Sequence, residues 1–149
     1  MSEPVDPLPH ALAEALRGFA FKLRRRLREQ ADAEDLPPSQ NAVLLRLEKD
    51  GPATTSALAR AEAMRPQSMG TIVAALEAAG LVTGSPDPED GRQTIIAITA
   101  ECRARLVHNR AVRLDWLTRT IDGALSPEEQ ASLLEIVPLL HRLIGEKGC

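Results

Sequence analysis

The sequence is poor in aromatic residues and has no tyrosine. Aromatic side chains make up 2% of its 149 residues, as one tryptophan and two phenylalanines. Proteins that bind single-stranded nucleic acids stack the bases on exposed aromatic rings. The composition therefore argues against a binding platform of that kind.

Cysteines are also few, and long apolar runs are missing. Cys102 and Cys149 match neither a metal-binding spacing nor a C-x-x-C motif, and the three histidines are too scattered for a metal site. No segment approaches the roughly 20 apolar residues of a membrane span. The acidic, proline-rich start MSEPVDPLPH does not resemble a signal peptide. We therefore expect a cytoplasmic protein with no metal, no cofactor and no membrane partner.

The remaining composition fits one globular domain over residues 1–149. Hydrophobic residues account for 44% and charged residues for 26%, which allows a buried core and a polar surface. The net charge of −3 gives no overall sign of a nucleic-acid partner. The sequence contains no nucleophile–base pattern and no glycine-rich phosphate loop. We therefore expect neither an enzyme nor catalytic residues.

Hydrophobic periodicity predicts mainly helices, with one β-hairpin in the second half of the chain. Three helices are predicted first: one from about Leu8 to about Ala31, one from the cap Ser39 to the break at Lys49–Pro52, and a short one capped by Thr54. A fourth helix starts at Pro66 and stops at Gly80.

The hairpin and two long helices complete the predicted order. The strands LVTGS and QTIIAIT flank the polar turn PDPEDGR. A fifth helix runs from about Ala100 to about Asp122, and a capping box of Ser126 and Glu129 starts the last helix. The last helix is expected to bury one apolar face, made by Leu133, Ile136, Val137, Leu140, Leu143 and Ile144.

The fourth helix lies within MRPQSMGTIVAALEAAG, residues 64–80, and its polar side is nearly uncharged. The spacing i, i+3, i+4 and i+7 predicts a buried face made by Met69, Ile72, Val73 and Leu76. Glycine and alanines make the opposite side thin. The N-terminal half of that side carries Arg65, Gln67, Ser68 and Thr71.

Two helices joined by a tight turn and followed by a hairpin are typical of a winged helix-turn-helix. The second helix of such a unit enters the DNA major groove and reads base edges with its N-terminal half. We therefore predict a mainly α fold with a small β-hairpin wing, and double-stranded DNA as the partner of the fourth helix.

From Leu36 to Leu106 the sequence resembles the MarR family of bacterial transcriptional regulators. The matching pieces are ALA at residues 57–59, MRPQSMGTIVAALEAAGLV at 64–82, DPEDGR at 87–92 and ITAE at 98–101. LSPEEQASLLEI also resembles the usual start of the family's last helix. The stretch from Leu36 to Leu106 is about half of the chain.

The resemblance implies a homodimer whose first and last two helices interlock. Residues 8–35 and 100–146 would then be dimerisation helices, and residues 36–99 would be the winged helix-turn-helix that binds DNA. Many such proteins are repressors that leave DNA when a small, often phenolic or lipophilic molecule binds. Others respond to the oxidation of a cysteine in the first helix, where this chain has none.

The resemblance also suggests which residues contact DNA. Asp90 and Arg92 match the family's wing tip, where the arginine reaches the minor groove and the aspartate holds it; a narrow minor groove attracts guanidinium groups. The other predicted DNA contacts are Arg65, Gln67, Ser68, Thr71 and Thr54. Each of these side chains could also be ordinary helix surface.

The predicted DNA-binding region departs from the family in its charge. Gly84 and Gly91 stand where the family commonly has arginine. Residues 54–99 contain three arginines against five acidic residues, a net charge of −2, although DNA affinity depends on neutralising phosphates. Either the basic stretch from Lys22 to Arg28, with Arg24 and Arg25, adds phosphate contacts, or the DNA affinity is low. The alternative function is therefore a ligand- or protein-binding module with weak DNA binding or none.

A small-molecule effector would need a pocket, for which Phe19, Phe21 and Met64 are speculative lining residues. Cys102 stands near the start of the fifth helix, where a helix N-terminus can lower a thiol pKa. A role for Cys102 as a small packed side chain is favoured over redox sensing.

Overall fold

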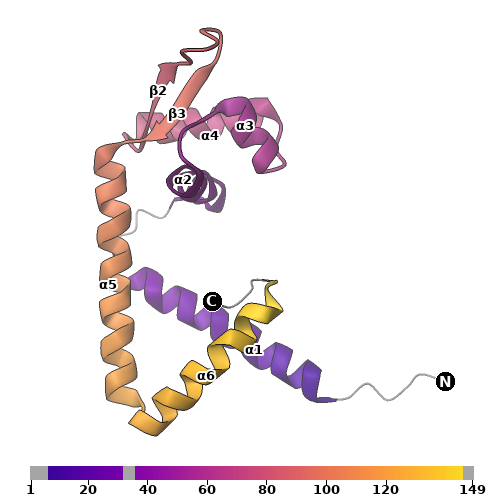
Figure 1. Ribbon diagram of the computed structural model, residues 1–149, viewed down its shortest axis with the longest axis vertical. Coiled ribbons are helices and arrows are strands. Elements are labelled where there is room, and N and C mark those ends of the chain that lie inside the picture. The colour runs from indigo at the N-terminus through magenta and orange to yellow at the C-terminus, as the bar shows by residue number, and fades with distance from the viewer. Residues whose placement is uncertain (1–6, 32–35, 146–149) are drawn as a thin grey trace, which may run out of the picture. The chain divides into compact units, whose positions relative to one another are not determined.

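The structure is a computed structural model of the chain, and it describes residues 7–31 and 36–145 (Figure 1). Its elements, in chain order, are α1 (Pro7–Glu29), α2 (Pro38–Asp50), β1 (Ala53–Thr54), α3 (Thr55–Ala61), α4 (Pro66–Ala78), β2 (Val82–Pro86), β3 (Thr94–Ile98), α5 (Ala100–Ala124) and α6 (Pro127–Leu143). The predicted fold class, mainly helical with a small hairpin, is confirmed.

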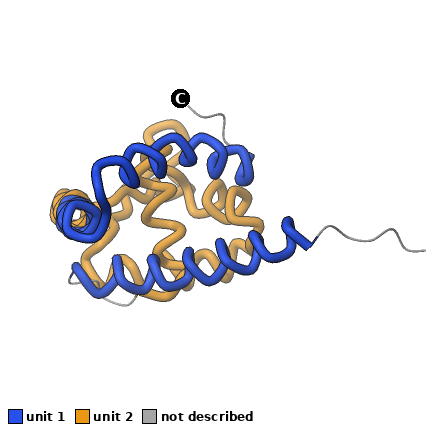
Figure 2. Tube along the Cα trace, turned by 90° about the horizontal axis from the view of Figure 1, so that it is seen from below, with its two compact units in different colours: residues 1–31, 111–149 blue, residues 32–110 orange. Residues whose placement is uncertain are grey.

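The chain divides into two compact units, which Figure 2 colours separately. Residues 32–110 form the winged unit, with α2, α3, α4, the sheet and the start of α5. Residues 1–31 and 111–149 form the helical unit, with α1, the rest of α5 and α6.

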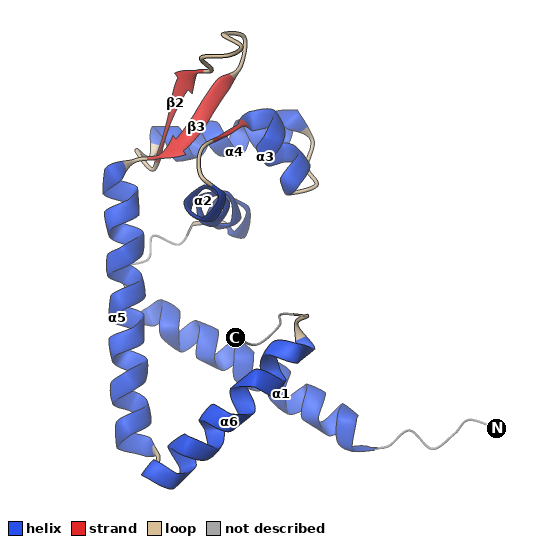
Figure 3. Cartoon of the chain, in the orientation of Figure 1, coloured by secondary structure: helices blue, strands red, loops and turns tan. Residues whose placement is uncertain are grey.

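The winged unit has a three-stranded antiparallel sheet in the order β1-β3-β2 (Figure 3). The hairpin register runs from Val82 opposite Ile98 to Pro86 opposite Thr94. The strand β1 is an addition to the predicted hairpin, and it pairs Ala53 with Ile96. Two residues carry no readable alternation, so periodicity could not have revealed this strand.

The core of the winged unit joins all its helices to the sheet. The buried apolar residues are Val43, Leu44, Leu47, Leu58, Ala59, Met69, Val73, Leu76, Leu81, Val82, Ile96 and Cys102. This set includes most of the predicted face of α4, and the remaining member, Ile72, is partly buried against the core. The burial of one face of α4 is therefore confirmed.

Local signals in the sequence set most helix ends as predicted. The Thr54 hydroxyl accepts a hydrogen bond from the Ala57 N–H at 3.1 Å and caps α3. The Thr99 hydroxyl does the same for the Cys102 N–H at 3.1 Å at the start of α5. Ser126 and Glu129 form the complete capping box of α6. Each bond satisfies a backbone donor that a helix N-terminus leaves free.

The predicted cap at Ser39 was wrong. Helix α2 already begins at Pro38, with Pro37 as the N-cap residue and no side-chain hydrogen bond. Proline suits the first helical position, because it has no N–H to satisfy and its fixed φ is close to the helical value. Ser39 therefore lies inside the first turn.

The described residues of the helical unit form no buried core within the single chain. No residue of α1 or α6 is buried, and α1 and α6 run well apart in Figure 2. The predicted burial of the apolar face of α6 was therefore wrong for the single chain: its six residues Leu133, Ile136, Val137, Leu140, Leu143 and Ile144 are exposed by 38% to 69%. The periodicity marks a face suited to burial, but no element of the described chain covers it.

Candidate nucleic-acid interface

Helix α4 presents one open face, because its other face anchors it in the winged unit. Met69 and Leu76 are fully buried and Val73 is 6% exposed. On the opposite side, Gln67, Ser68 and Thr71 are exposed, followed by exposed alanines. The sequence-predicted DNA-contacting residues of α4 therefore all lie on the open face.

The N-terminus of α4 has free hydrogen-bond donors. Arg65 is the N-cap residue and makes no side-chain cap, and Pro66 has no N–H. The first helical bond runs from the Met69 N–H to the Arg65 carbonyl at 3.0 Å. The N–H groups of Gln67 and Ser68 therefore have no partner within the helix. Such an end favours an anion, for example a DNA phosphate.

Two of the predicted contact residues use their hydroxyls within the fold. The Thr71 hydroxyl donates to the Gln67 carbonyl at 3.3 Å, which leaves its methyl group for a partner. The half-buried Thr54 hydroxyl accepts the capping bond of α3. Its O–H remains available to donate to an acceptor such as a DNA phosphate.

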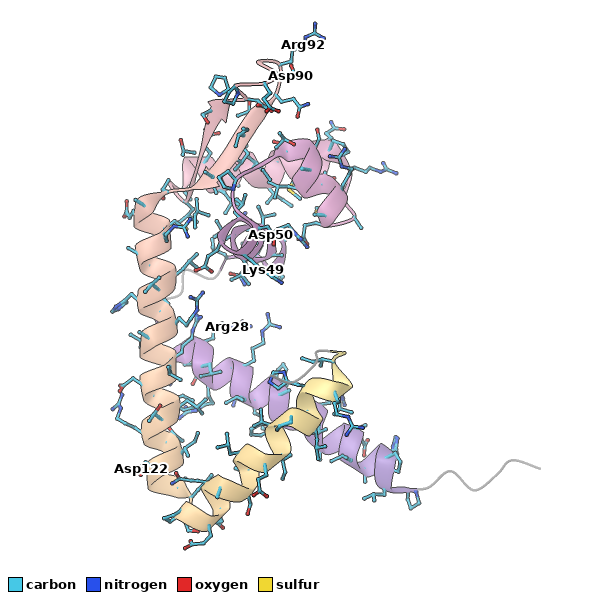
Figure 4. All side chains as sticks on the ribbon, in the orientation of Figure 1. Arg28, Lys49, Asp50, Asp90, Arg92 and Asp122 are labelled. Atoms are coloured by element: carbon cyan, nitrogen blue, oxygen red, sulfur yellow. The ribbon has the colours of Figure 1, made fainter. Side chains whose placement is uncertain are left out.

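The wing tip is built by carboxylates that bind backbone N–H groups. Asp90 Oδ1 accepts from the Arg92 N–H at 3.1 Å, and Asp87 Oδ1 accepts from the Glu89 N–H at 2.9 Å. Figure 4 shows Asp90 and Arg92 at the tip of the β2–β3 loop, with Arg92 projecting outward. Asp90 thus fixes the backbone from which the Arg92 side chain extends, and the guanidinium remains available.

The acidic balance of residues 54–99 is partly offset in the structure by an arginine from outside that segment. Glu62 accepts a hydrogen bond from the Arg46 Nε, and Arg46 lies on α2, outside residues 54–99. This bond raises the pKa of the Arg46 guanidinium. The pair could not be predicted from the sequence, because 16 residues separate its members.

The remaining predicted site residues do not gather around α4 within one unit. Arg24, Arg25, Phe19 and Phe21 are exposed on α1, in the helical unit. Arg25 forms an ion pair with Glu29 at 3.8 Å. The roles of these residues in DNA and ligand binding stay predictions.

Met64 is the third predicted ligand-binding residue. It is partly buried against the core of the winged unit. Cys102 is 2% exposed in the same core, which fits the packed role favoured for it.

Other kinds of site find no support in the described residues. No group of three His, Cys, Asp or Glu side chains there could hold a metal ion. None of the described helices is long and apolar enough to cross a membrane.

Comparisons with known proteins agree with this geometry. The model of the MarR family matches residues 36–94. An uncharacterised HTH-type transcriptional regulator of Mycobacterium bovis is 33% identical over 136 residues, which cover 91% of this chain and 94% of that protein. The HTH-type transcriptional repressor NicR of Pseudomonas putida is 28% identical over 140 residues, with 91% and 88% covered. A crystal structure from Pseudomonas aeruginosa, described as that of a transcriptional regulator, has 36% identity and a TM-score of 0.81, with 95% and 98% covered.

Proposed function

Because the chain belongs to the MarR family of transcriptional regulators, we propose that it is a homodimeric repressor that binds a double-stranded DNA operator. As a member of this family it is a regulator and not an enzyme. The observation that carries the proposal is the open, nearly neutral face of α4 opposite the buried Met69, Val73 and Leu76. A bacterial regulator of this kind acts in the cytoplasm, where the chromosome lies.

In the proposed complex, the N-terminal half of α4 enters the major groove. Gln67 suits a bidentate contact with adenine, and the Thr71 methyl group suits the methyl group of thymine. The free N–H groups of Gln67 and Ser68 hold a phosphate, which sets the register of the helix. Arg92 extends from the wing into the adjacent minor groove.

The exposed apolar side chains of the helical unit support a dimer with a second copy of the chain. Phe19 and Phe21 of α1 are 61% and 71% exposed, and Leu143 of α6 is 68% exposed. Burying one such side chain is worth about 1.5–3 kcal/mol. Large exposed apolar patches mark interaction surfaces, and a two-fold dimer would present two copies of α4 to successive turns of the DNA.

Repression is proposed because the relative NicR is named as a repressor. Release by a small molecule is the simplest way for such a repressor to respond to a signal. Phe19, Phe21 and Met64 remain the proposed lining of the effector site.

Binding to the DNA upstream of its own gene tests the proposal. A mobility shift with that DNA, repeated with an unrelated duplex and over a range of salt concentrations, should give a specific complex that weakens as salt rises. Footprinting should then show two half-sites about 34–36 Å apart. A dimer that binds neither duplex would contradict the proposal and favour the alternative function.

The alternative is a module that senses a ligand or a protein and binds DNA weakly or not at all. The net charge of −2 over residues 54–99 favours it. The ion pair of Glu62 with Arg46 weakens this argument, because one of the five acidic residues is neutralised from outside the counted segment.

A further inference from the structure

One cluster of charged side chains joins α2 to the turn between α3 and α4. The Arg46 Nε donates to Glu62 Oε1. The same guanidinium lies 3.3 Å from Asp50 Oδ2 and 3.5 Å from the carbonyl of Ala61, the last residue of α3. The side chains of Arg46 and Glu62 are 36% and 21% exposed, so the pair is only partly in contact with water.

Glu62 occupies the residue at which α3 ends and the turn begins. It is the C-cap of α3. Ala63 follows with φ +51°, and the Met64 N–H donates to the Ala59 carbonyl at 2.8 Å. The N-cap of α4, Arg65, comes next. The carboxylate held by Arg46 therefore lies three residues before the first residue of the proposed DNA contact.

The turn needs an outside support, and α2 can provide one. A left-handed backbone conformation is unfavourable for alanine, and such residues persist where the surrounding structure fixes them. Arg46 is well placed to do so, because its neighbours Val43 and Leu47 are fully buried and hold α2 in the core. A guanidinium near the last carbonyls of α3 also favours the negative end of that helix.

We propose that Arg46 is a positioning residue for α4, which acts by holding Glu62 and so fixes the turn from which Arg65 and Gln67 reach DNA. The inference rests on the proposed function, since its consequence is measured in DNA binding. Arg46 itself contacts no DNA in this scheme.

Glu62→Ala separates positioning from simple electrostatics. Loss of a negative charge from the DNA-facing region should strengthen DNA binding if charge alone matters. If Glu62 helps to position α4, its loss should weaken binding to the specific duplex roughly tenfold, the scale of one lost base contact. Fluorescence anisotropy with the specific duplex, at a temperature where each variant is fully folded by circular dichroism, gives the answer. Tighter or unchanged binding would overturn the inference.

The partner variant and a matched control complete the experiment. Arg46→Ala should weaken binding by a similar factor, and the double variant should be no weaker than either single variant, because all three lose the same contact. Arg110→Ala is the control, because it removes the same positive charge from the same unit. Arg110 pairs with Glu48 at 2.9 Å and not with a residue of the turn. Its binding should stay within about twofold of the unchanged protein. Equal losses in Arg46→Ala and Arg110→Ala would also overturn the inference.

Amide hydrogen exchange keeps the inference separate from the proposed function. In Arg46→Ala, but not in Arg110→Ala, the hydrogen-bonded amides of Ala63, Met64 and Met69 should exchange faster, since the turn and the first turn of α4 open more often. If the unchanged protein binds no DNA, the proposed function fails, while faster exchange would still support the hold on the turn. Unchanged exchange would reject that hold.

Discussion

Buried and exposed apolar residues are divided between the two units. Every buried apolar side chain in the described part of the chain belongs to the winged unit, and no residue of α1 or α6 is buried. The winged unit thus meets the requirement for a core by itself, with helices on a small sheet. The helical unit carries the same kind of side chains on open faces. Hydrophobic periodicity therefore locates the apolar face of α4 and that of α6 equally well. It does not say whether another part of the same chain covers the face.

The largest expected effect comes from a charge on the open face of α6. Leu140→Glu should leave the protein monomeric at micromolar concentration, with dimer affinity lowered by at least about 100-fold, since burying an unpaired carboxylate is costly. Sedimentation or light scattering gives the mass. Ala131→Glu is the control, because Ala131 is exposed about 180° around the same helix and should keep the dimer. A dimeric Leu140→Glu protein would remove the proposed role of this face.

A cavity in the winged unit should act on that unit alone. Leu44 is 1% exposed, so Leu44→Ala should lower the stability of the winged unit by about 2–5 kcal/mol. Faster amide exchange in α2 and α4 would measure this loss. Trp116, the only tryptophan, lies in the helical unit. The midpoint of its fluorescence transition should be the same in Leu44→Ala as in the unchanged protein. In both proteins this midpoint should rise with protein concentration. A Trp116 transition that falls together with the stability of the winged unit would show one cooperative unit, contrary to the comparison.

Arg92→Ala should separate DNA binding from dimer formation. The loss of the wing guanidinium should weaken DNA binding by about 1–3 kcal/mol. The slope of log affinity against log salt concentration should become less steep by about 1, because one cation fewer acts on the DNA. The mass should remain that of a dimer, because Arg92 belongs to the winged unit. Arg119→Ala, which removes an exposed arginine paired with Asp115 in the helical unit, should change neither property. Unaltered affinity of Arg92→Ala would remove the wing assignment.

Most features that depend on residues close in the sequence were predicted, apart from the cap at Ser39. Contacts between residues far apart in the sequence were not predicted. The buried face of α4, the cap Thr54 and the capping box at Ser126 depend on residues a few positions apart. The strand β1 pairs Ala53 with Ile96, and the pair of Arg46 with Glu62 joins residues 16 positions apart, so both depend on how the chain folds. The apolar face of α6 finds no cover within the described chain. Local periodicity alone does not reveal such contacts.

The smallest effect is expected where α3 and α4 end in the same way with different residues. In both, the second residue past the C-cap donates back to the last helical turn: Met64 to Ala59 at 2.8 Å and Leu81 to Leu76 at 3.0 Å. The left-handed residue between them is Ala63 in one turn and Gly80 in the other, with φ +51° and +72°. Glycine suits this position, whereas alanine costs roughly 1–2 kcal/mol there.

Exchanging the two residue types should therefore shift the stability of the winged unit in opposite directions. Ala63→Gly should stabilise it by about 0.5–1 kcal/mol, because the relief of strain exceeds the extra freedom that glycine gives the unfolded chain. Gly80→Ala should destabilise it by a similar amount through the backbone alone, since an added Cβ meets no atom within 4 Å. Amide exchange in α3 and α4 measures both shifts, and the Trp116 transition should not follow them. Destabilisation by Ala63→Gly would mean that the alanine methyl group makes a packing contact that outweighs the strain of its backbone.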